Sequence, residues 1–296
     1  MDKRAAQPTT EIFSVPTNEG ALWTEAFGSS SDPAVVLISG MTGQAIRWDE
    51  AFCCALARDG FRVLRFDHRD TGQSVLIDFN STPYSLDDMA DDVIAIMDAQ
   101  GIKQAHLVGS SMGGMIAQIA AIKYTGRVQT ITSMLSSPIT ANFSAGMPVD
   151  DLPGPDADYV KRRAELIRNP PSDFEEMIQQ RVIDYSLISM PPFDPQKQEA
   201  FIRAEIARAR DYAASWNHLR AMERTRPQDR RPLLKQLRIP SLVIHGANDP
   251  SLPPAHAIAT AEAIPNSVLL ILDGIGHEFP ERAWKQMRQH FMALTG

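Results

Sequence analysis

Cysteine is scarce in this sequence: only two occur in 296 residues, and they are neighbours, Cys53 and Cys54. Neighbouring side chains of a helix point about 100° apart, so the two thiols are badly placed to form a disulfide. The chain therefore lacks the crosslinked framework of small secreted proteins. We expect reduced, packed thiols and a cytoplasmic protein.

Long apolar runs and basic clusters are missing as well. No apolar stretch approaches the roughly 18 residues that span a bilayer, and the opening segment MDKRAAQPTTEIF has no apolar core for a signal peptide. Lys and Arg number 29 against 36 Asp and Glu, a net charge of −7. Nucleic acids need clustered Lys and Arg, so we expect neither a membrane nor a nucleic-acid partner. There is no H-E-x-x-H motif and no Cys/His cluster for a metal.

The sequence instead shows an alternation of strand-like and helix-like segments. Its composition, 44% hydrophobic and 22% charged, suits a globular protein with a sizeable core. Residues 11–15 and 21–27 predict an opening hairpin, and the apolar run 34–39 is typical of a strand buried on both faces. Further strands are predicted at 62–66, 104–108, 130–135, 241–246 and 268–272, and helices at 46–58, 85–99, 112–124, 254–264 and 282–294. This alternation predicts a doubly wound, mostly parallel sheet of the α/β class.

A long insertion interrupts the alternation after Ser137-Pro138. It predicts helices but no strand, with the helices at 156–168, 173–186, 194–210 and 214–224. We therefore predict a core of residues 1–138 and 231–296 and an inserted helical cap of residues 139–230. An insertion at the carboxyl ends of the strands would lie over a site there and act as a lid.

Residues 104–124, QAHLVGSSMGGMIAQIAAIKY, predict a strand, a sharp turn and a helix. The turn carries the G-x-S-x-G pattern from Gly109 to Gly113, which at such a junction holds the middle serine exposed above the sheet. Ser111 has a glycine two residues before and two after it, whereas Ser110 would have Val108 and Met112 there, and these would clash at a tight bend. Ser111 is thus the predicted nucleophile, and the alternative is a glycine-rich turn without a function.

A serine hydroxyl is a weak nucleophile near pH 7 and needs a base, which in turn needs an acid to orient it. His277 is the predicted base, because it lies in the loop that leaves the last strand and follows Gly276 directly. The alternative is a surface histidine. The other histidines are expected to be packed or locally bonded (His106 and His245), in the cap (His218), in a polar turn (His68) or on helix surfaces (His256 and His290).

The predicted acid is Asp249, which follows the strand 241–246. The other usual position follows the strand 130–135, but residues 129–149 contain no Asp or Glu, and Asp273 is too close to His277 in the chain. A turn cap before Pro250 is the alternative role for Asp249. The order of serine, acid and histidine along the chain is the order expected for this fold.

An acyl-transfer site also needs donors for the oxyanion. We predict the N–H of Met112, at the start of a helix, and the N–H of Met41, after the strand 34–39. The loop 67–74 is expected to be a structural turn. Trp48 has two open roles, in the pocket wall or in the core.

Together these features resemble the α/β-hydrolase superfamily over nearly the full chain, and within it the aclacinomycin methylesterase-like branch of small esterases. The resemblance lies in the start of the helix at 48–56, RVLRFDHRDTGQS, VGSSMGG, VIHGANDP and GIGHEFP. It implies a cofactor-free serine hydrolase that acts on a small-molecule carboxylic ester, including a methyl ester on a polycyclic polyketide. C–C bond, lactone or thioester hydrolysis on the same residues, and a non-hydrolytic ligand-binding or cyclase relative, are the alternatives. The chain departs from the superfamily at Ser39-Gly40, where His-Gly is usual.

Overall fold

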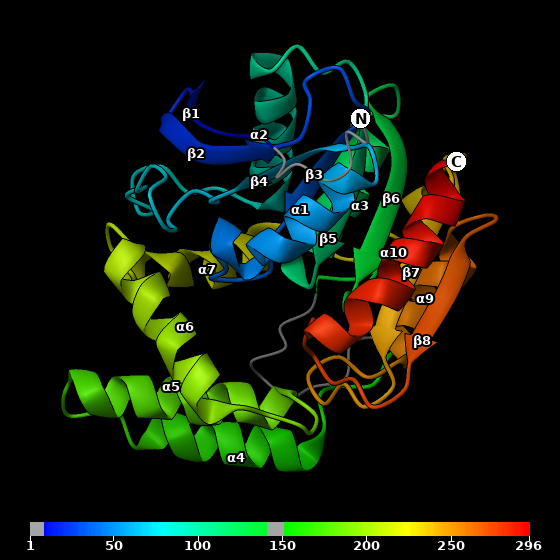
Figure 1. Ribbon diagram of the computed structural model, residues 1–296. Coiled ribbons are helices and arrows are strands. Elements are labelled where there is room, and N and C mark those ends of the chain that lie inside the picture. Colours follow the sequence, from blue (N-terminus) through cyan, green and yellow to red (C-terminus); the bar gives the residue numbers. More distant parts are fainter. Residues whose placement is uncertain (1–8, 141–150) are drawn as a thin grey trace.

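The computed structural model describes residues 9–140 and 151–296, which form one eight-stranded sheet (Figure 1). The strand order is β1-β2-β4-β3-β5-β6-β7-β8. β2 pairs antiparallel with both of its neighbours, and every pair from β4 to β8 is parallel. The strands are β1 Thr10–Thr17, β2 Gly20–Phe27, β3 Ala34–Ile38, β4 Arg62–Phe66, β5 Ala105–Ser110, β6 Val128–Met134, β7 Ser241–Gly246 and β8 Val268–Leu272. The predicted hairpin and mostly parallel sheet are confirmed.

Helices cover both faces of the sheet (Figure 1). One apolar core lies under α2, α3 and α9, and the second lies under α1 and α10 on the opposite face. β3 and β4 are buried along their whole length, as expected for central parallel strands. These helices are α1 Glu50–Arg58, α2 Leu86–Ala99, α3 Met112–Lys123, α9 Ala255–Ala263 and α10 Glu281–Thr295, with a short α8 at Arg231–Leu234.

Most predicted helices agree with the structure to within two residues at each end, and two differ by more. The helix expected at 46–58 begins only at Glu50, because the Asp49 side chain accepts the Ala51 N–H at 2.7 Å and caps it. A separate 3₁₀ turn, Ala45–Arg47, precedes it. The helix expected at 214–224 is divided into a 3₁₀ turn, Ala213–Trp216, and α7, Asn217–Arg224.

The cysteine prediction holds: Cys53 is buried, Cys54 is half-buried, and both are free thiols. Within residues 9–140 and 151–296, no helix combines the length and the apolarity needed to cross a bilayer.

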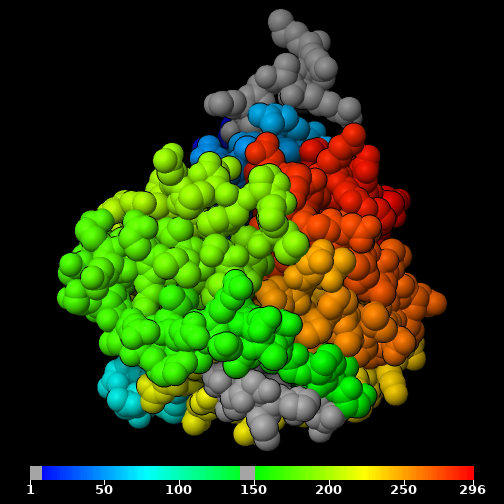
Figure 2. All heavy atoms as spheres, turned by 90° about the horizontal axis from the view of Figure 1, so that it is seen from below, coloured from blue at the N-terminus to red at the C-terminus, as the bar shows by residue number. Residues whose placement is uncertain are grey.

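The insertion between β6 and β7 leaves and re-enters the core at one point. Ile139 and Asp229 form an antiparallel bridge, and the Arg230 N–H donates to the Pro138 carbonyl at 2.9 Å. The helices between these ends lie below the sheet in Figure 1, and from below they fill one side of the molecule beside the orange and red C-terminal segment (Figure 2). They are α4 Ala157–Arg168, α5 Phe174–Ile188, α6 Pro195–Arg208 and α7.

A buried arginine joins the two ends of the insertion to the core. Arg230 is 1% exposed, and its guanidinium donates to Gln118 Oε1 at 3.1 Å, to the Ser137 carbonyl at 2.9 Å and to the Thr140 hydroxyl. Burial lowers the pKa of Arg230 to about 10, so it stays charged at neutral pH.

Two ion pairs hold α6 against the core. Arg47 forms a two-pronged pair with Glu205, at 2.9 and 3.0 Å, and Arg208 Nη1 lies 2.6 Å from Asp67 Oδ2. Both carboxylate side chains are fully buried. Asp67 also accepts the Ala45 N–H at 2.8 Å, so the loop 67–74 is the structural turn that was predicted.

Candidate active site

Ser111 sits at the sharp turn between β5 and α3. Its φ is 56° and its ψ is −121°, a left-handed conformation that costs a non-glycine residue strain. The two flanking glycines are required by close backbone contacts: a Cβ on Gly109 would lie 2.1 Å from the Gly113 carbonyl oxygen, and one on Gly113 would lie 2.2 Å from that of Ile38. Ser111, rather than Ser110, is therefore the residue at the tight turn between the two glycines.

The three residues predicted from distant parts of the sequence lie together. His277 Nε2 is 3.0 Å from Ser111 Oγ, and His277 Nδ1 is 2.6 Å from Asp249 Oδ2. A carboxylate only accepts hydrogen bonds, so Nδ1 carries the proton and Nε2 is left to accept from the hydroxyl. Asp249 is fixed from its other oxygen, which accepts the N–H groups of Ser251 and Leu252 at 2.9 and 2.8 Å.

The charges in this group shift the pKa values of its members. Burial alone would raise the pKa of Asp249, but His277 and His245 outweigh it and hold that pKa well below its usual range. Burial alone would lower the pKa of His277, but the Asp249 carboxylate outweighs it and raises the pKa above the ordinary imidazole value. Asp249 is therefore ionised at neutral pH and stabilises a positive charge on the ring.

Gly276, directly before His277, is required by a close backbone contact. A Cβ on Gly276 would lie 2.1 Å from the carbonyl oxygen of Ile188, at the end of α5. The same carbonyl accepts the His277 N–H at 2.7 Å. The loop that carries the imidazole is therefore bound directly to the insertion.

The loop after β3 lies against Ser111. A Cβ on Gly40 would lie 3.2 Å from Ser111 Cβ. Among the described residues, neither the Met41 N–H nor the Met112 N–H has a hydrogen-bond partner, and the latter opens α3. Two N–H groups without a partner in the described part of the chain are therefore found in the residues next to Ser111 and Gly40.

Two buried histidines support this loop, and sequence reasoning missed their role. His68 Nε2 lies 3.0 Å from the Ser39 carbonyl, and the Thr42 N–H donates to His218 Nδ1 at 3.1 Å. His218 Nε2 in turn donates to the Arg69 carbonyl at 2.9 Å. These contacts support the loop at Ser39-Gly40, where the chain departs from the usual His-Gly. Since His218 is 176 positions away from Thr42, no local pattern could have indicated the pair.

Two further histidines lie near Asp249. His245 is fully buried, with Nε2 2.7 Å from the Leu252 carbonyl and 3.3 Å from Asp249 Oδ2, which agrees with the predicted local bonding. The expectation that His256 is a surface residue is wrong. It is 1% exposed and bonds Ser137 Oγ and the Pro153 carbonyl, because its face of α9 turns toward the insertion.

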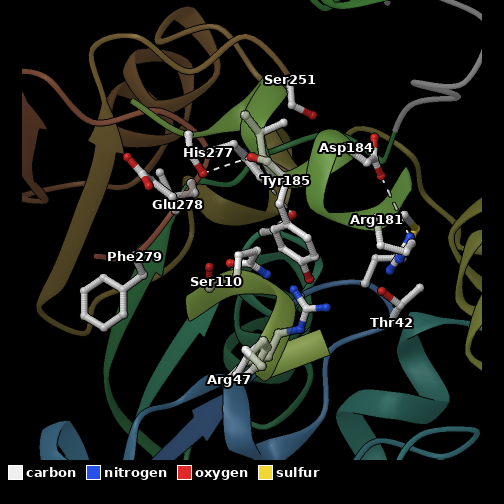
Figure 3. Close-up of a pocket in the computed structure, with 18 of the residues that line it drawn as sticks. Thr42, Arg47, Ser110, Arg181, Asp184, Tyr185, Ser251, His277, Glu278 and Phe279 are labelled. Atoms are coloured by element: carbon white, nitrogen blue, oxygen red, sulfur yellow. Dashed lines mark hydrogen bonds and ion pairs between the residues drawn. The ribbon is translucent and has the colours of Figure 1, made fainter. Parts of the chain in front are cut away.

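A cavity of about 1210 Å³ opens over the serine (Figure 3). Core and insertion both line it, and most of the lining is apolar. Trp48 has both of its predicted roles, since it is 2% exposed, stacks on Phe52 and still contributes to the cavity wall. Among the described residues, no group of three or more His, Cys, Asp or Glu side chains is arranged to hold a metal.

A comparison with known families decides the classification. The family model described as alpha/beta hydrolase fold matches residues 33–281. The chain belongs to the α/β-hydrolase family. This confirms the predicted family and fold class.

Individual members of the family agree with this. The chain is 32% identical over 278 residues to rhodomycin D methylesterase DauP of Streptomyces sp. (strain C5), which covers 90% of this chain and 92% of the relative. It is 31% identical, with the same coverage, to rhodomycin D methylesterase DnrP of Streptomyces peucetius. Its fold matches the crystal structure of esterase RhEst1 from Rhodococcus sp. ECU1013 with a TM-score of 0.72, at 23% identity and over 96% of this chain and 99% of that one. The predicted enzyme class, a carboxylic ester hydrolase of the α/β-hydrolase type, is confirmed.

Proposed function

We propose that this α/β-hydrolase cleaves its ester through an acyl-enzyme on Ser111, with His277 as base and Asp249 as orienting acid. The observation that carries the proposal is the continuous hydrogen-bonded series from Ser111 Oγ through the imidazole to a buried carboxylate, at 3.0 and 2.6 Å. It lies at the floor of a cavity large enough for a substrate.

In the first half-reaction, His277 Nε2 takes the Ser111 proton as Oγ attacks the ester carbonyl. The ring becomes positively charged, and Asp249 stabilises that charge without taking the proton. The imidazolium then protonates the departing alcohol. In the second half-reaction, water attacks the acyl-enzyme through the same base and the acid is released.

The N–H groups of Met41 and Met112 are the proposed oxyanion donors. Both lack a partner among the described residues; Met112 follows Ser111 directly, and Met41 follows Gly40, where a Cβ would lie 3.2 Å from Ser111 Cβ. As donors that are already oriented in the resting enzyme, they would stabilise the negative oxygen without reorganisation. The strained φ of Ser111 supports this, since a sharp turn between a strand and a helix exposes the serine hydroxyl at the end of the sheet.

For the substrate we propose a methyl ester of a bulky acyl group. The names of the two Streptomyces relatives support the methyl ester, and the volume and apolar lining of the cavity support the bulky acyl group. Residues 139–230 would act as a cap that selects the acyl group, because α5 to α7 supply much of the cavity wall.

Replacing Ser111 with alanine tests the proposal. We expect hydrolysis of p-nitrophenyl butyrate to fall at least about 10⁴-fold, with an unchanged melting temperature, because the nucleophile is removed and the fold is not. A fluorophosphonate should label the parent and leave the variant unlabelled. The Ser110→Ala variant is the matched control and should keep both properties. Parent-like turnover by Ser111→Ala would refute the assignment.

The same assay separates the alternatives. A parent that is labelled but hydrolyses only lactones, thioesters or C–C bonds would keep the residue roles and change the reaction. A parent that resists the label and hydrolyses none of these would favour a ligand-binding or cyclase role.

A further inference from the structure

A cluster of arginines stands in the cavity wall, across from His277. Figure 3 shows the Tyr185 ring above Arg47, with Arg181 to its right and Glu278 to its left. The Arg47 guanidinium lies 5.0 Å from the centre of the Tyr185 ring, and that of Arg181 lies 6.0 Å from it. Two positive groups therefore share one aromatic ring at the far end of the substrate site.

Arg181 is poorly satisfied by the protein. Its Nη2 donates to the Tyr212 hydroxyl at 2.9 Å, but its Nε is buried without a partner among the described residues. The nearest carboxylate, Asp184, is 3.8 Å away, beyond hydrogen-bonding distance. A guanidinium has five N–H donors, and only one of those on Arg181 has a hydrogen-bond partner among the described residues, in a side chain that lines the cavity.

The ion pairs around Arg181 leave one positive charge without a matching carboxylate. Arg47 is neutralised by its two-pronged pair with Glu205. Arg163 and Arg181 share the single carboxylate of Asp184, at 3.4 and 3.8 Å. The three arginines thus face two carboxylates, and one monoanion would balance them. The other charged side chains of the lining have their own roles. Arg282 pairs with Glu278, and Asp49 and Asp194 cap helices. Lys197 and Glu281 are exposed.

The surroundings of Arg181 suit a flat ligand that accepts hydrogen bonds. The rings of Tyr212 and Trp216 lie 5.7 and 5.6 Å from its guanidinium and hold it in place. Burial raises the pKa of Tyr185, so its phenol keeps the proton that it can donate. A carboxylate matches both, because it is planar and carries one charge that a guanidinium can bind with two parallel bonds.

We propose that Arg181, with Arg47 and Tyr185 beside it, binds a carboxylate on the acyl part of the substrate, so that the preferred esters are half-esters of dicarboxylic acids. This rests on the proposed function, since it assigns the ester bond to Ser111 at the other side of the cavity. The carboxylate would hold the acyl chain across the cavity and place its ester carbonyl over the serine.

The test uses p-nitrophenyl half-esters from glutaric to sebacic acid, each paired with the neutral p-nitrophenyl ester of equal acyl length. At the chain length that spans the cavity, we expect kcat/KM of the parent to favour the anionic ester about tenfold or more, the effect of a charged hydrogen bond. Arg181→Gln should remove that preference, mainly through KM, and leave the neutral ester within about twofold.

Two further variants sharpen the result. Asp184→Asn removes the internal competitor for Arg181 and should increase the preference for the anionic ester. Lys197→Gln removes an equal charge from the exposed rim of the cavity and should leave the preference unchanged. The inference is overturned if the parent shows no preference at any chain length, or if Arg181→Gln keeps it. If Arg181→Gln does not fold, Asp184→Asn still tests the proposal. An Asp184→Asn variant whose preference for the anionic ester equals that of the parent contradicts it.

Calorimetry separates failure of this site from failure of the proposed function. If neither ester series is hydrolysed, or if Ser111→Ala hydrolyses both like the parent, the proposed function fails. Titration with sodium octanoate and with octanamide still tests the subsite. Tighter binding of octanoate by the parent, lost in Arg181→Gln or strengthened in Asp184→Asn, supports it. Equal binding of the two probes by the parent refutes it.

Discussion

Replacing His218 with leucine removes the acceptor that holds the loop beside Ser111. The Thr42 N–H donates to His218 Nδ1 at 3.1 Å, and both residues are buried. A buried N–H left without a partner costs about 1–3 kcal/mol, which the loop can recover only by moving. Because Met41 directly precedes Thr42, that movement displaces one of the two proposed oxyanion donors.

The size of the effect follows from what the donor is worth. Complete loss of one oxyanion donor lowers kcat about 10²–10³-fold. The leucine variant misplaces the Met41 N–H rather than deleting it, so we expect kcat to fall about ten- to a hundredfold. KM should change by less than about threefold, because the donor acts on the transition state and not on the bound ester.

The assay is steady-state hydrolysis of p-nitrophenyl butyrate at pH 8, with the urea midpoint measured alongside. His218→Asn is the matched control, because its side-chain oxygen can accept the same N–H and should restore part of kcat. If His218→Leu keeps kcat within about twofold while losing stability, the histidine only packs, and the argument for the loop fails. The same holds if leucine and asparagine lower kcat equally.

Two other predictions follow from buried charge. The raised pKa of His277 predicts that kcat/KM is full where the ring is neutral and declines as pH falls through a midpoint above 6.5, the ordinary imidazole value; a pH profile with its midpoint at or below 6.5 would contradict this. Arg230→Met leaves Gln118, Ser137 and Thr140 without their buried donor, and we expect a loss of about 3 kcal/mol in urea unfolding. A midpoint equal to that of the parent would show that the arginine is not needed to fasten the insertion.

The sheet could be predicted because its chemistry is local. A central parallel strand must be apolar on both faces, so β3 and β4 can be recognised from short stretches of sequence. Ser111, His277 and Asp249 could also be predicted from the sequence, since each follows a strand and the carboxyl ends of parallel strands meet at one edge of the sheet. The structure brings these side chains within hydrogen-bonding distance.

The remaining details depend on contacts between distant segments. Residues 67–74 carry three charged side chains and a histidine in a polar-looking loop, yet Asp67 and His68 are fully buried. Asp67 pairs with Arg208 of α6, and the His68 ring packs edge-on against that of His218 of α7, both more than a hundred positions later. The same reason explains the error at His256, which bonds Ser137 at the end of the first core segment and Pro153 in the insertion. No periodicity within a short segment can report such neighbours.

The bridge between Ile139 and Asp229 has a consequence for how such enzymes diversify. Since the two ends of the inserted chain touch, the sheet and its helices are joined to the same two closely spaced ends whatever length of polypeptide lies between them. The entropy of closing that loop grows only slowly with its length. Natural variation can therefore exchange whole helices at this junction, and with them the lining of the cavity, without disturbing the proposed catalytic residues.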